Sequence, residues 1–373
     1  MKSRRWLVAV VAPLAAMVFS VGVASLALIA FDIDPLFAFK EMWTFGTSTE
    51  SLINIANRSV PLYVAAMAVA VGFKMNLFNI GVEGQYLLAA LFAAWAGALV
   101  ALPAVLHVAF ILLVAMVVGS GWAWIAGFLK VKRGIHEVIS TIMLNFIGFS
   151  LSAYLFLNVF RGETEGLIVA TGQIPKSGWM PSLNPVLGWF GVTPRRGSEL
   201  QSFLIIAIAL GIGYHLLVKR SRFGFDLRAS GINPAAAQAS GVDPKRMIIR
   251  TMMISGAIAG LVGMSVLLGF FHQYPQDFSR GYGFNGIAVA LLGRNHAAGM
   301  VFAALLWGFL ERSSLILDLR DVPSEIVTII QGTVVLGVVV AYEVVSRLAE
   351  RQTVRAAARA AAALESGGAQ EAA

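Results

Sequence analysis

Long apolar runs recur from one end of this chain to the other, and several of them are about as long as a lipid bilayer is thick. A membrane-spanning helix needs about 17 to 25 apolar residues. Only 13% of the 373 residues are charged, whereas soluble domains carry roughly 25%. Because so few charges cannot cover a polar surface of ordinary size, the chain is an integral membrane protein. We predict an all-α, polytopic membrane fold.

Ten apolar segments are candidates for membrane spans, and counts of eight or nine also fit the pattern. They are residues 6–31, 52–73, 82–101, 104–129, 138–160, 201–218, 248–271, 284–294, 297–316 and 324–346. The segment 284–294 is about half as long as a span, which predicts a half-helix or a re-entrant piece. The segment 6–31 is longer than the ~7–15 apolar residues of a signal peptide, so it is expected to be an uncleaved first span.

Basic residues gather in short segments between the apolar runs and predict on which side of the membrane each loop lies. In a soluble protein the net charge of +8 would indicate a nucleic-acid partner, but here it follows the positive-inside rule. The N-terminus, the loop 219–250 and the C-terminus are expected in the cytoplasm, whereas 32–50 and 161–200 are expected outside. Ten crossings satisfy all of these assignments. The predicted parts are a transmembrane domain over 1–349 and a flexible cytoplasmic tail over 350–373.

Polar residues interrupt the apolar pattern in the string 78–85, which reads Phe-Asn-Ile-Gly-Val-Glu-Gly-Gln. Ionisable groups inside a bilayer are costly, so the string marks a solute pathway, a packing joint or an interfacial loop. Glu83 either lines the pathway or fixes a broken helix by accepting backbone N–H bonds. Asn79 and Gln85 offer neutral donors and acceptors, which suit an uncharged polar solute and helix packing equally well.

A similar texture returns later in the chain, where an apolar Gly-rich run precedes Gly-Phe-Asn-Gly-Ile at 283–287. If spans two to five correspond to spans seven to ten, the two halves enter the membrane from opposite faces. That arrangement is an inverted repeat, which is common among transport proteins with broken helices near the bilayer midplane. The alternative is a chance resemblance between Gly-rich membrane helices.

The loop 219–250 contains the signals of a short helix. Asn233 can cap its N-terminus just before a proline, Ala235, Ala236 and Ala237 continue it, and Gly241 suits the position past its end. A loop that only reversed the chain would not need such a helix, whereas a helix that docks onto a cytoplasmic partner would. An interfacial helix resting on lipid headgroups is the alternative.

Taken together, four strings resemble known permeases of ATP-binding-cassette importers. The loop helix resembles their coupling motif, Glu-Ala-Ala followed by Gly, although Ala235 stands at the Glu position. The strings 78–85, 134–145 and 283–293 resemble the nucleoside/simple-sugar branch of the ribose and branched-chain-amino-acid permease superfamily. The resemblance spans about residues 50 to 345, and His136 stands where the family more often has Asn.

The resemblance implies a permease subunit that imports nucleosides or related purines across a bacterial inner membrane. Ribose-like sugars and branched-chain amino acids are the alternatives within the family. The implied partners are a cytoplasmic ATPase that binds ATP and Mg²⁺, a second homologous permease in a heterodimer, and an extracytoplasmic substrate-binding lipoprotein. The expected substrate pathway comprises Phe78, Asn79, Glu83, Gln85, Asn145, Phe284 and Asn285, and the expected ATPase-coupling residues are Asn233, Ala235, Ala236, Ala237 and Gly241.

Two other classes of function compete with the importer. A secondary transporter that works alone also fits an inverted repeat, but ion-coupled carriers use intramembrane carboxylates, and only Glu83 and Glu311 are candidates. An enzyme is not expected, because no phosphate-binding loop, His-Glu-x-x-His or Gly-x-Ser-x-Gly motif occurs. The histidines are scattered without metal-ligand spacing, so no metal site and no cofactor on this chain are predicted.

Overall fold

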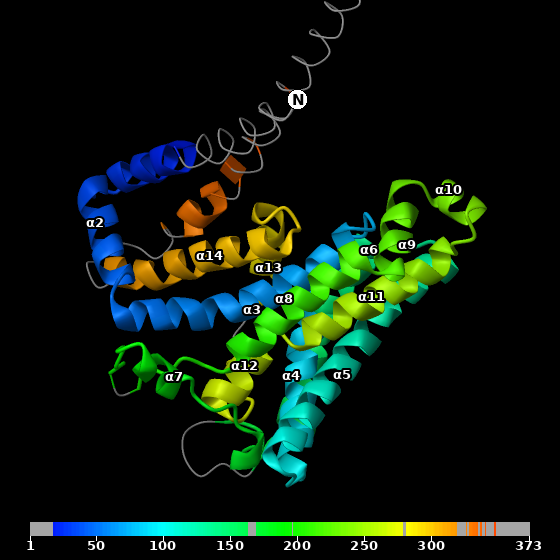
Figure 1. Ribbon diagram of the computed structural model, residues 1–373, viewed down its shortest axis with the longest axis horizontal. Helices are drawn as coiled ribbons and strands as arrows, with labels where there is room; N and C mark the ends of the chain where they lie inside the picture. The colour runs from blue at the N-terminus through cyan, green and yellow to red at the C-terminus, as the bar shows by residue number, and fades with distance from the viewer. Residues whose placement is uncertain are drawn as a thin grey trace, which may run out of the picture. The chain divides into compact units, whose positions relative to one another are not determined.

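The computed structural model describes residues 18–162, 169–195, 197–278 and 281–318, with short stretches between 326 and 347 (Figure 1). The described residues are mainly helical, and the few β-type contacts among them are isolated bridges rather than strands. They divide into two compact units, one formed by residues 46–312 and the other by the residues on either side of that range. Each unit is described by itself.

The helices of the larger unit follow one another closely along the chain. They are α3 (Thr49–Phe73), α4 (Val82–Leu99), α5 (Ala104–Arg133), α6 (Glu137–Leu155), α7 (Asn184–Trp189), α8 (Phe203–Arg220), α9 (Arg222–Ile232), α10 (Pro234–Ala239), α11 (Pro244–Gly260), α12 (Met264–Val266), α13 (Tyr282–Leu292) and α14 (Ala297–Asp318). Single π-helical turns extend α6 to Phe160 and α12 to Phe271. The last residues of α14 belong to the smaller unit.

Seven helices among the described residues are long and apolar enough to cross a membrane, or eight if one bent pair counts as a span. The polytopic all-α fold is therefore confirmed, whereas the count of ten is not. Residues 6–17 of the first predicted span and most of 324–346 lie outside the described residues. The predicted half-helix at 284–294 is α13, which has only 11 residues.

The core of the larger unit is formed by α3, α4 and α11. In the apolar stretches of the spans that α3, α4 and α11 begin, 83%, 72% and 61% of the residues are buried. In the corresponding stretches of α5, α6 and α8, only 22 to 28% are buried. The three outer helices therefore carry much of the exposed apolar surface of this unit. Helices α9 and α10 lie at one end of the bundle and α7 lies at the other (Figure 1).

Small residues allow α5 and α11 to pack in close contact. Ala115, Gly119 and Ala123 recur every four residues on α5, and Gly256 and Gly260 do so on α11. A side chain at Gly119 would collide with the carbonyl of Gly256, and one at Gly260 with the carbonyl of Ala115. Close backbone approach of this kind is how membrane helices associate when lipid supplies no hydrophobic drive.

In the smaller unit, the segment 32–50 that was predicted as an outer loop contains a helix, and the side of the membrane on which it lies stays a prediction. Residues Pro35–Gly46 form helix α2, which follows a helix over Val18–Ala30 at an angle of 114°. The carboxylate of Asp34 accepts the N–H of Leu36 at 2.9 Å and caps α2, with Pro35 as its first residue. Asp34, Lys40 and Glu41 therefore belong to α2 and its cap.

Two other predicted loops also contain helices. The loop 219–250 holds the predicted helix α10 and, before it, α9, which was not predicted. The segment 161–200 contains α7, a 3₁₀ turn over Lys176–Gly178 and bridges that pair Arg161 with Thr171 and Ser182 with Gln201. Which side of the membrane these loops occupy stays a prediction.

Candidate functional site

The connection between α3 and α4 folds back into the protein. The N–H of Leu77 donates to the carbonyl of Gly72 at 3.0 Å, which reverses the chain just after α3 ends. Asn79 then donates to Ser255 at 2.8 Å, and Ser255 donates to the carbonyl of Ala68 on α3 at 2.6 Å. The polar string therefore lies between α3 and α11, about 8 Å back along α3 from its end.

The amides of Asn79 and Gln85 pair with one another. Each donates to the oxygen of the other, at 3.0 and 2.9 Å, and both residues are 1% exposed. Asn145 on α6 makes two more bonds, accepting from the N–H of Gly84 at 2.9 Å and donating to the carbonyl of Ile80 at 2.9 Å. Three neutral side chains thus satisfy the backbone and one another where the helix is interrupted, as buried polar groups require.

Glu83 joins the two segments that resemble one another in sequence. Its carboxylate accepts the N–H groups of Gly281 at 2.5 Å and Gly283 at 2.8 Å, and the hydroxyl of Tyr86 at 3.0 Å. The two glycines lie at the start of α13, where unpaired N–H groups and the helix dipole favour a negative charge. Glu83 is 1% exposed and therefore acts as a cap for a helix that begins 199 residues later.

The start of α13 fits closely against α4. A side chain at Gly283 would collide with the backbone nitrogen of Glu83 and lie 2.7 Å from its Cα atom. Glycine is required here because the two backbones touch. Between the two alternatives for Glu83, the geometry places it in a joint between helices, and a further role in a solute pathway stays a prediction.

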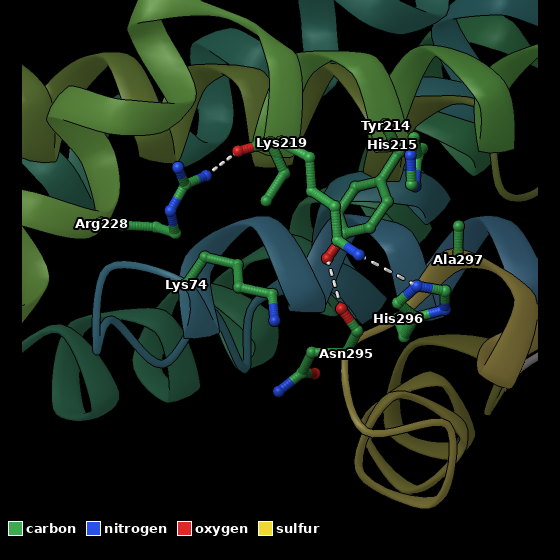
Figure 2. Close-up of a pocket in the computed structure, with 9 residues that line it drawn as sticks. Lys74, Tyr214, His215, Lys219, Arg228, Asn295, His296 and Ala297 are labelled. Atoms are coloured by element: carbon green, nitrogen blue, oxygen red, sulfur yellow. Dashed lines mark hydrogen bonds between the residues drawn. The ribbon is translucent and has the colours of Figure 1, made fainter. Parts of the chain in front are cut away.

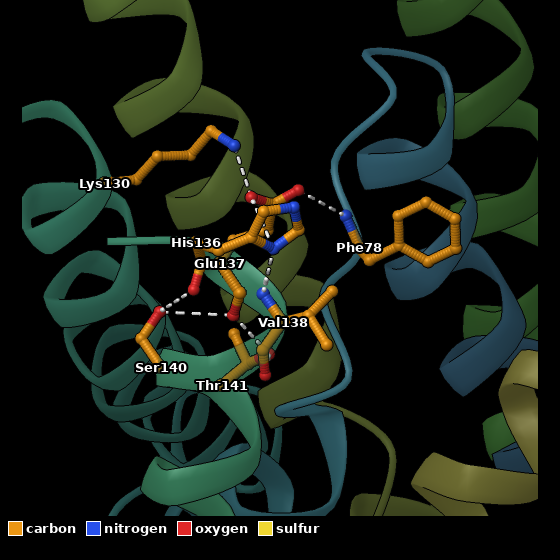
Figure 3. Close-up of polar contacts among 7 residues, drawn as sticks. All are labelled: Phe78, Lys130, His136, Glu137, Val138, Ser140 and Thr141. Atoms are coloured by element: carbon orange, nitrogen blue, oxygen red, sulfur yellow. Dashed lines mark hydrogen bonds and ion pairs between the residues drawn. The ribbon is translucent and has the colours of Figure 1, made fainter. Parts of the chain in front are cut away.

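A second buried carboxylate, Glu137, holds the same connection from the side of α6 (Figure 3). It is 2% exposed, forms an ion pair with Lys130 on α5, and accepts the N–H of Phe78 at 3.4 Å. Lys130 and Phe78 approach the carboxylate from opposite sides (Figure 3). Sequence reasoning missed Glu137, although it lies within the string 134–145.

His136 caps the helix that carries Glu137. Its Nδ1 accepts the N–H of Val138 at 3.3 Å. His136, which departs from the family pattern, therefore serves as the N-cap, a role that Asn fills at many helices. The same Nδ1 lies 3.5 Å from the carboxylate of Glu137.

The predicted pathway residues fall into two groups. Asn79, Glu83, Gln85 and Asn145 are brought together and buried, with their polar atoms bonded within the protein. In contrast, Phe78 and Phe284 are 47% and 46% exposed, and Asn285 is half-buried in the first turn of α13. Contact with a solute is not tested by this arrangement and stays a prediction for all seven.

The predicted helix in the loop 219–250 is present with its predicted cap. Asn233 accepts the N–H of Ala236 at 3.0 Å, and Gly241 has a φ of 84° just past the end of the helix. Ala237 is buried at 3% exposure, whereas Ala235 and Ala236 are exposed. The helix therefore offers a free face on the side of the bundle that carries the basic loop.

Comparison with known proteins assigns the family. The model for the permease component of branched-chain amino acid transport systems matches residues 51–339. The chain belongs to this permease family. Both interrupted segments and the loop 219–250 lie within the matched range, so the resemblance read from the four strings is confirmed, and the chain is a transport component rather than an enzyme.

Several individual relatives align with this chain over most of its length. The guanosine ABC transporter permease protein of Bacillus subtilis is 33% identical over 89% of this chain and 93% of its own length. The glucose ABC transporter permease protein of Haloferax volcanii is 32% identical, with coverages of 87% and 85%. The nucleoside ABC transporter permease protein of Lactococcus lactis is 29% identical, with coverages of 93% and 95%. The solved PsaBC structure from Streptococcus pneumoniae has a TM-score of 0.41, 13% identity, and coverages of 82% and 94%.

Proposed function

We propose that this permease imports nucleosides or related purines across a bacterial inner membrane, with both termini in the cytoplasm. Two relatives that cover nearly the whole chain are named for guanosine and for nucleosides. The relative named for glucose is almost equally similar, so a ribose-like or hexose sugar is the second candidate. Branched-chain amino acids, from the family description, are the third.

One structural observation carries the choice of an uncharged solute. Among the described residues of the joint between α4 and α13 the one carboxylate, Glu83, accepts backbone N–H groups and the hydroxyl of Tyr86, and the nearby side chains of Asn79 and Gln85 are amides. A solute that passes here meets no unpaired charge among the described residues of the joint. The exposed rings of Phe78 and Phe284 flank the joint in sequence and offer faces on which a base can stack.

The energy for transport comes, in this proposal, from ATP and Mg²⁺ bound by a cytoplasmic ATPase. The exposed face of α10 at Ala235 and Ala236 docks onto that ATPase, with Asn233 and Gly241 defining the ends of the helix. Because Ala235 replaces the Glu of the family motif, docking rests on shape and apolar contact rather than on a salt bridge. A second, homologous permease and a substrate-binding lipoprotein complete the importer.

A movement of α10 can be transmitted to the membrane helices through α11. Asp243 caps α11 by accepting the N–H groups of Lys245 at 3.0 Å and Arg246 at 3.2 Å, only four residues after α10 ends. Helix α11 also carries Ser255, which bonds to Asn79 at the interrupted connection. A displacement of α10 by the ATPase would thus reach the proposed pathway through one helix.

Uptake measurements test this proposal. Cells with and without the permease, with the ATPase intact, are given labelled guanosine, adenosine, uridine, ribose and glucose. We expect loss of nucleoside uptake alone when the permease is absent. Loss of sugar uptake alone would replace the proposed solute by the second candidate, and no change for any of the five would remove both.

A companion experiment tests the energy source. Inactivating the partner ATPase should abolish uptake without unfolding the permease. If uptake persists without the ATPase but collapses when an uncoupler dissipates the ion gradient at normal ATP levels, the protein is a secondary transporter and the importer proposal fails.

A further inference from the structure

A basic pocket opens at the end of the bundle where α3 and α8 finish. Its volume is about 160 Å³. Five basic side chains line it: Lys74 after α3, His215 and Lys219 on α8, Arg228 on α9 and His296 before α14. Figure 2 shows these side chains reaching the same space from different elements.

No negatively charged residue lines the pocket among the residues that the structure describes. Within the described part of the chain Lys74, Lys219 and Arg228 form no salt bridge. Arg228 instead donates to the carbonyl of Val218, and Lys219 lies 3.3 Å from Nε2 of His296. Cations held together without a counter-charge repel one another, unless an anion binds among them.

Burial and, to a smaller extent, this repulsion shift the pKa values of two lining groups. Burial lowers the pKa of Lys74, and the positive charges of Lys219 and Arg228 lower it further. Burial also lowers the pKa of His296, with additional contributions from Lys219, His215 and Lys74. Within the described part of the chain the neighbouring charges that act on these two groups are positive, so a bound anion would raise both pKa values.

One side of the pocket is formed by α9, which leads directly to α10. Helix α9 carries Arg228 and runs directly into α10, while Asn76 after α3 donates to the carbonyl of Gly231 at the end of α9, at 2.7 Å. On the opposite wall, Tyr214 on α8 donates to the carbonyl of Asn295 at 2.9 Å. The pocket therefore joins the start of the loop 219–250 to the connection between α13 and α14.

We propose that this pocket binds a phosphate group, and that the bound phosphate fastens α9 to the ends of α3 and α8. Two lysines and an arginine supply the charge-assisted donors that phosphate oxygens accept. The phosphate is either that of an anionic phospholipid headgroup, at the predicted cytoplasmic surface of the bilayer, or free inorganic phosphate. The proposal does not depend on which solute the permease carries.

Thermal unfolding of the purified full chain tests the proposal with two probes. In lipid-free neutral detergent, sodium phosphate is compared with sodium chloride at equal ionic strength. In nanodiscs of phosphatidylcholine, phosphatidylglycerol is either included or omitted, and lipid that stays bound after purification is identified by mass spectrometry. Neither readout requires transport, so failure of the proposed function leaves this test intact.

Two charge-removing variants, Lys219→Gln and Lys74→Gln, are compared with Lys132→Gln as a matched control. Lys132 is exposed in the last turn of α5 and does not line the pocket. We expect one of the two phosphate sources to raise the melting temperature of the wild type and of the control. Each pocket variant should weaken that binding about tenfold, the effect of losing one charge-assisted contact.

The outcomes separate the sources and can overturn the proposal. A response to inorganic phosphate in lipid-free detergent identifies free phosphate, and a response only to phosphatidylglycerol identifies the lipid headgroup. No response to either source overturns the proposal, as does an equal response in the wild type and both pocket variants. If one pocket variant fails to fold, the other decides the result.

Discussion

Removing the carboxylate of Glu83 should loosen the joint between α4 and α13. In Glu83→Gln the side chain keeps its shape, but one oxygen becomes an NH₂ group that cannot accept a hydrogen bond. Whichever way the amide is turned, it faces the N–H of either Gly281 or Gly283 with a donor. One buried backbone N–H therefore loses its partner, and the other loses a charged acceptor.

The size of the effect follows from these bonds. A buried donor without a partner costs about 1–3 kcal/mol, and replacing a charged acceptor by a neutral one costs about 1 kcal/mol more. We therefore expect Glu83→Gln to lower the free energy of unfolding by about 2–4 kcal/mol. Tyr86→Phe removes the hydroxyl's bond to the carboxylate and should cost about 0.5–1.5 kcal/mol. This variant is the matched control.

Reversible unfolding of the purified permease in mixed detergent measures both variants, and nucleoside uptake is measured in parallel. The expected order of stability is wild type, Tyr86→Phe, Glu83→Gln. The argument fails if Glu83→Gln is no less stable than Tyr86→Phe. If Glu83→Gln keeps its stability but loses uptake, Glu83 acts on the solute rather than on the joint.

Three further predictions concern other parts of the permease. Gly283→Ala places a methyl group against the backbone of Glu83, so it should lower the free energy of unfolding by about 1–3 kcal/mol and reduce uptake, whereas a shift below 0.5 kcal/mol would refute the close fit. Asn233→Ala removes the cap of α10, which costs about 0.5–2 kcal/mol of local helix stability; uptake should fall while the melting temperature stays constant, and Asn233→Asp should restore it. Burial and the charge of Lys219 lower the pKa of His296 below its ordinary 6.5, so the unfolded chain takes up the proton first and the protein loses stability as the pH falls from 6.5. The melting temperature of the wild type should therefore fall more steeply below pH 6.5 than that of His296→Asn, and parallel curves would contradict this.

Local signals in the sequence predicted helix ends well. Asn233 with its following proline and Gly241 define α10 because a cap, a proline and a left-handed residue act within a few positions of the helix. The same signal at Asp34 and Pro35 begins α2, but the acidic residues around it were interpreted as a loop. Helix α9 contains weak helix formers such as Gly224 and Ser230, and its signal, the cap at Ser221, stands alone.

Long-range contacts could not be predicted in the same way. The alternatives for Glu83 included accepting backbone N–H groups, but nothing near it in the sequence identifies the start of α13 as their source. Glu137 was overlooked because an acidic residue in the first turn of a helix is ordinary. Its ion pair with Lys130 forms only when α5 and α6 lie side by side. Glu83 and Glu137 can be recognised as links between helices only from their contacts in the folded structure.

The contact between α5 and α11 has a consequence for how movement travels through the permease. Because the backbones are in close contact at Gly119, Gly256 and Gly260, we expect the two helices to move together. A displacement that begins at the capped start of α11 would then move α5 as well, so that the two helices shift as one rigid pair. Any bending that accompanies this movement is then expected in the non-helical segments at the ends of α5 and α11.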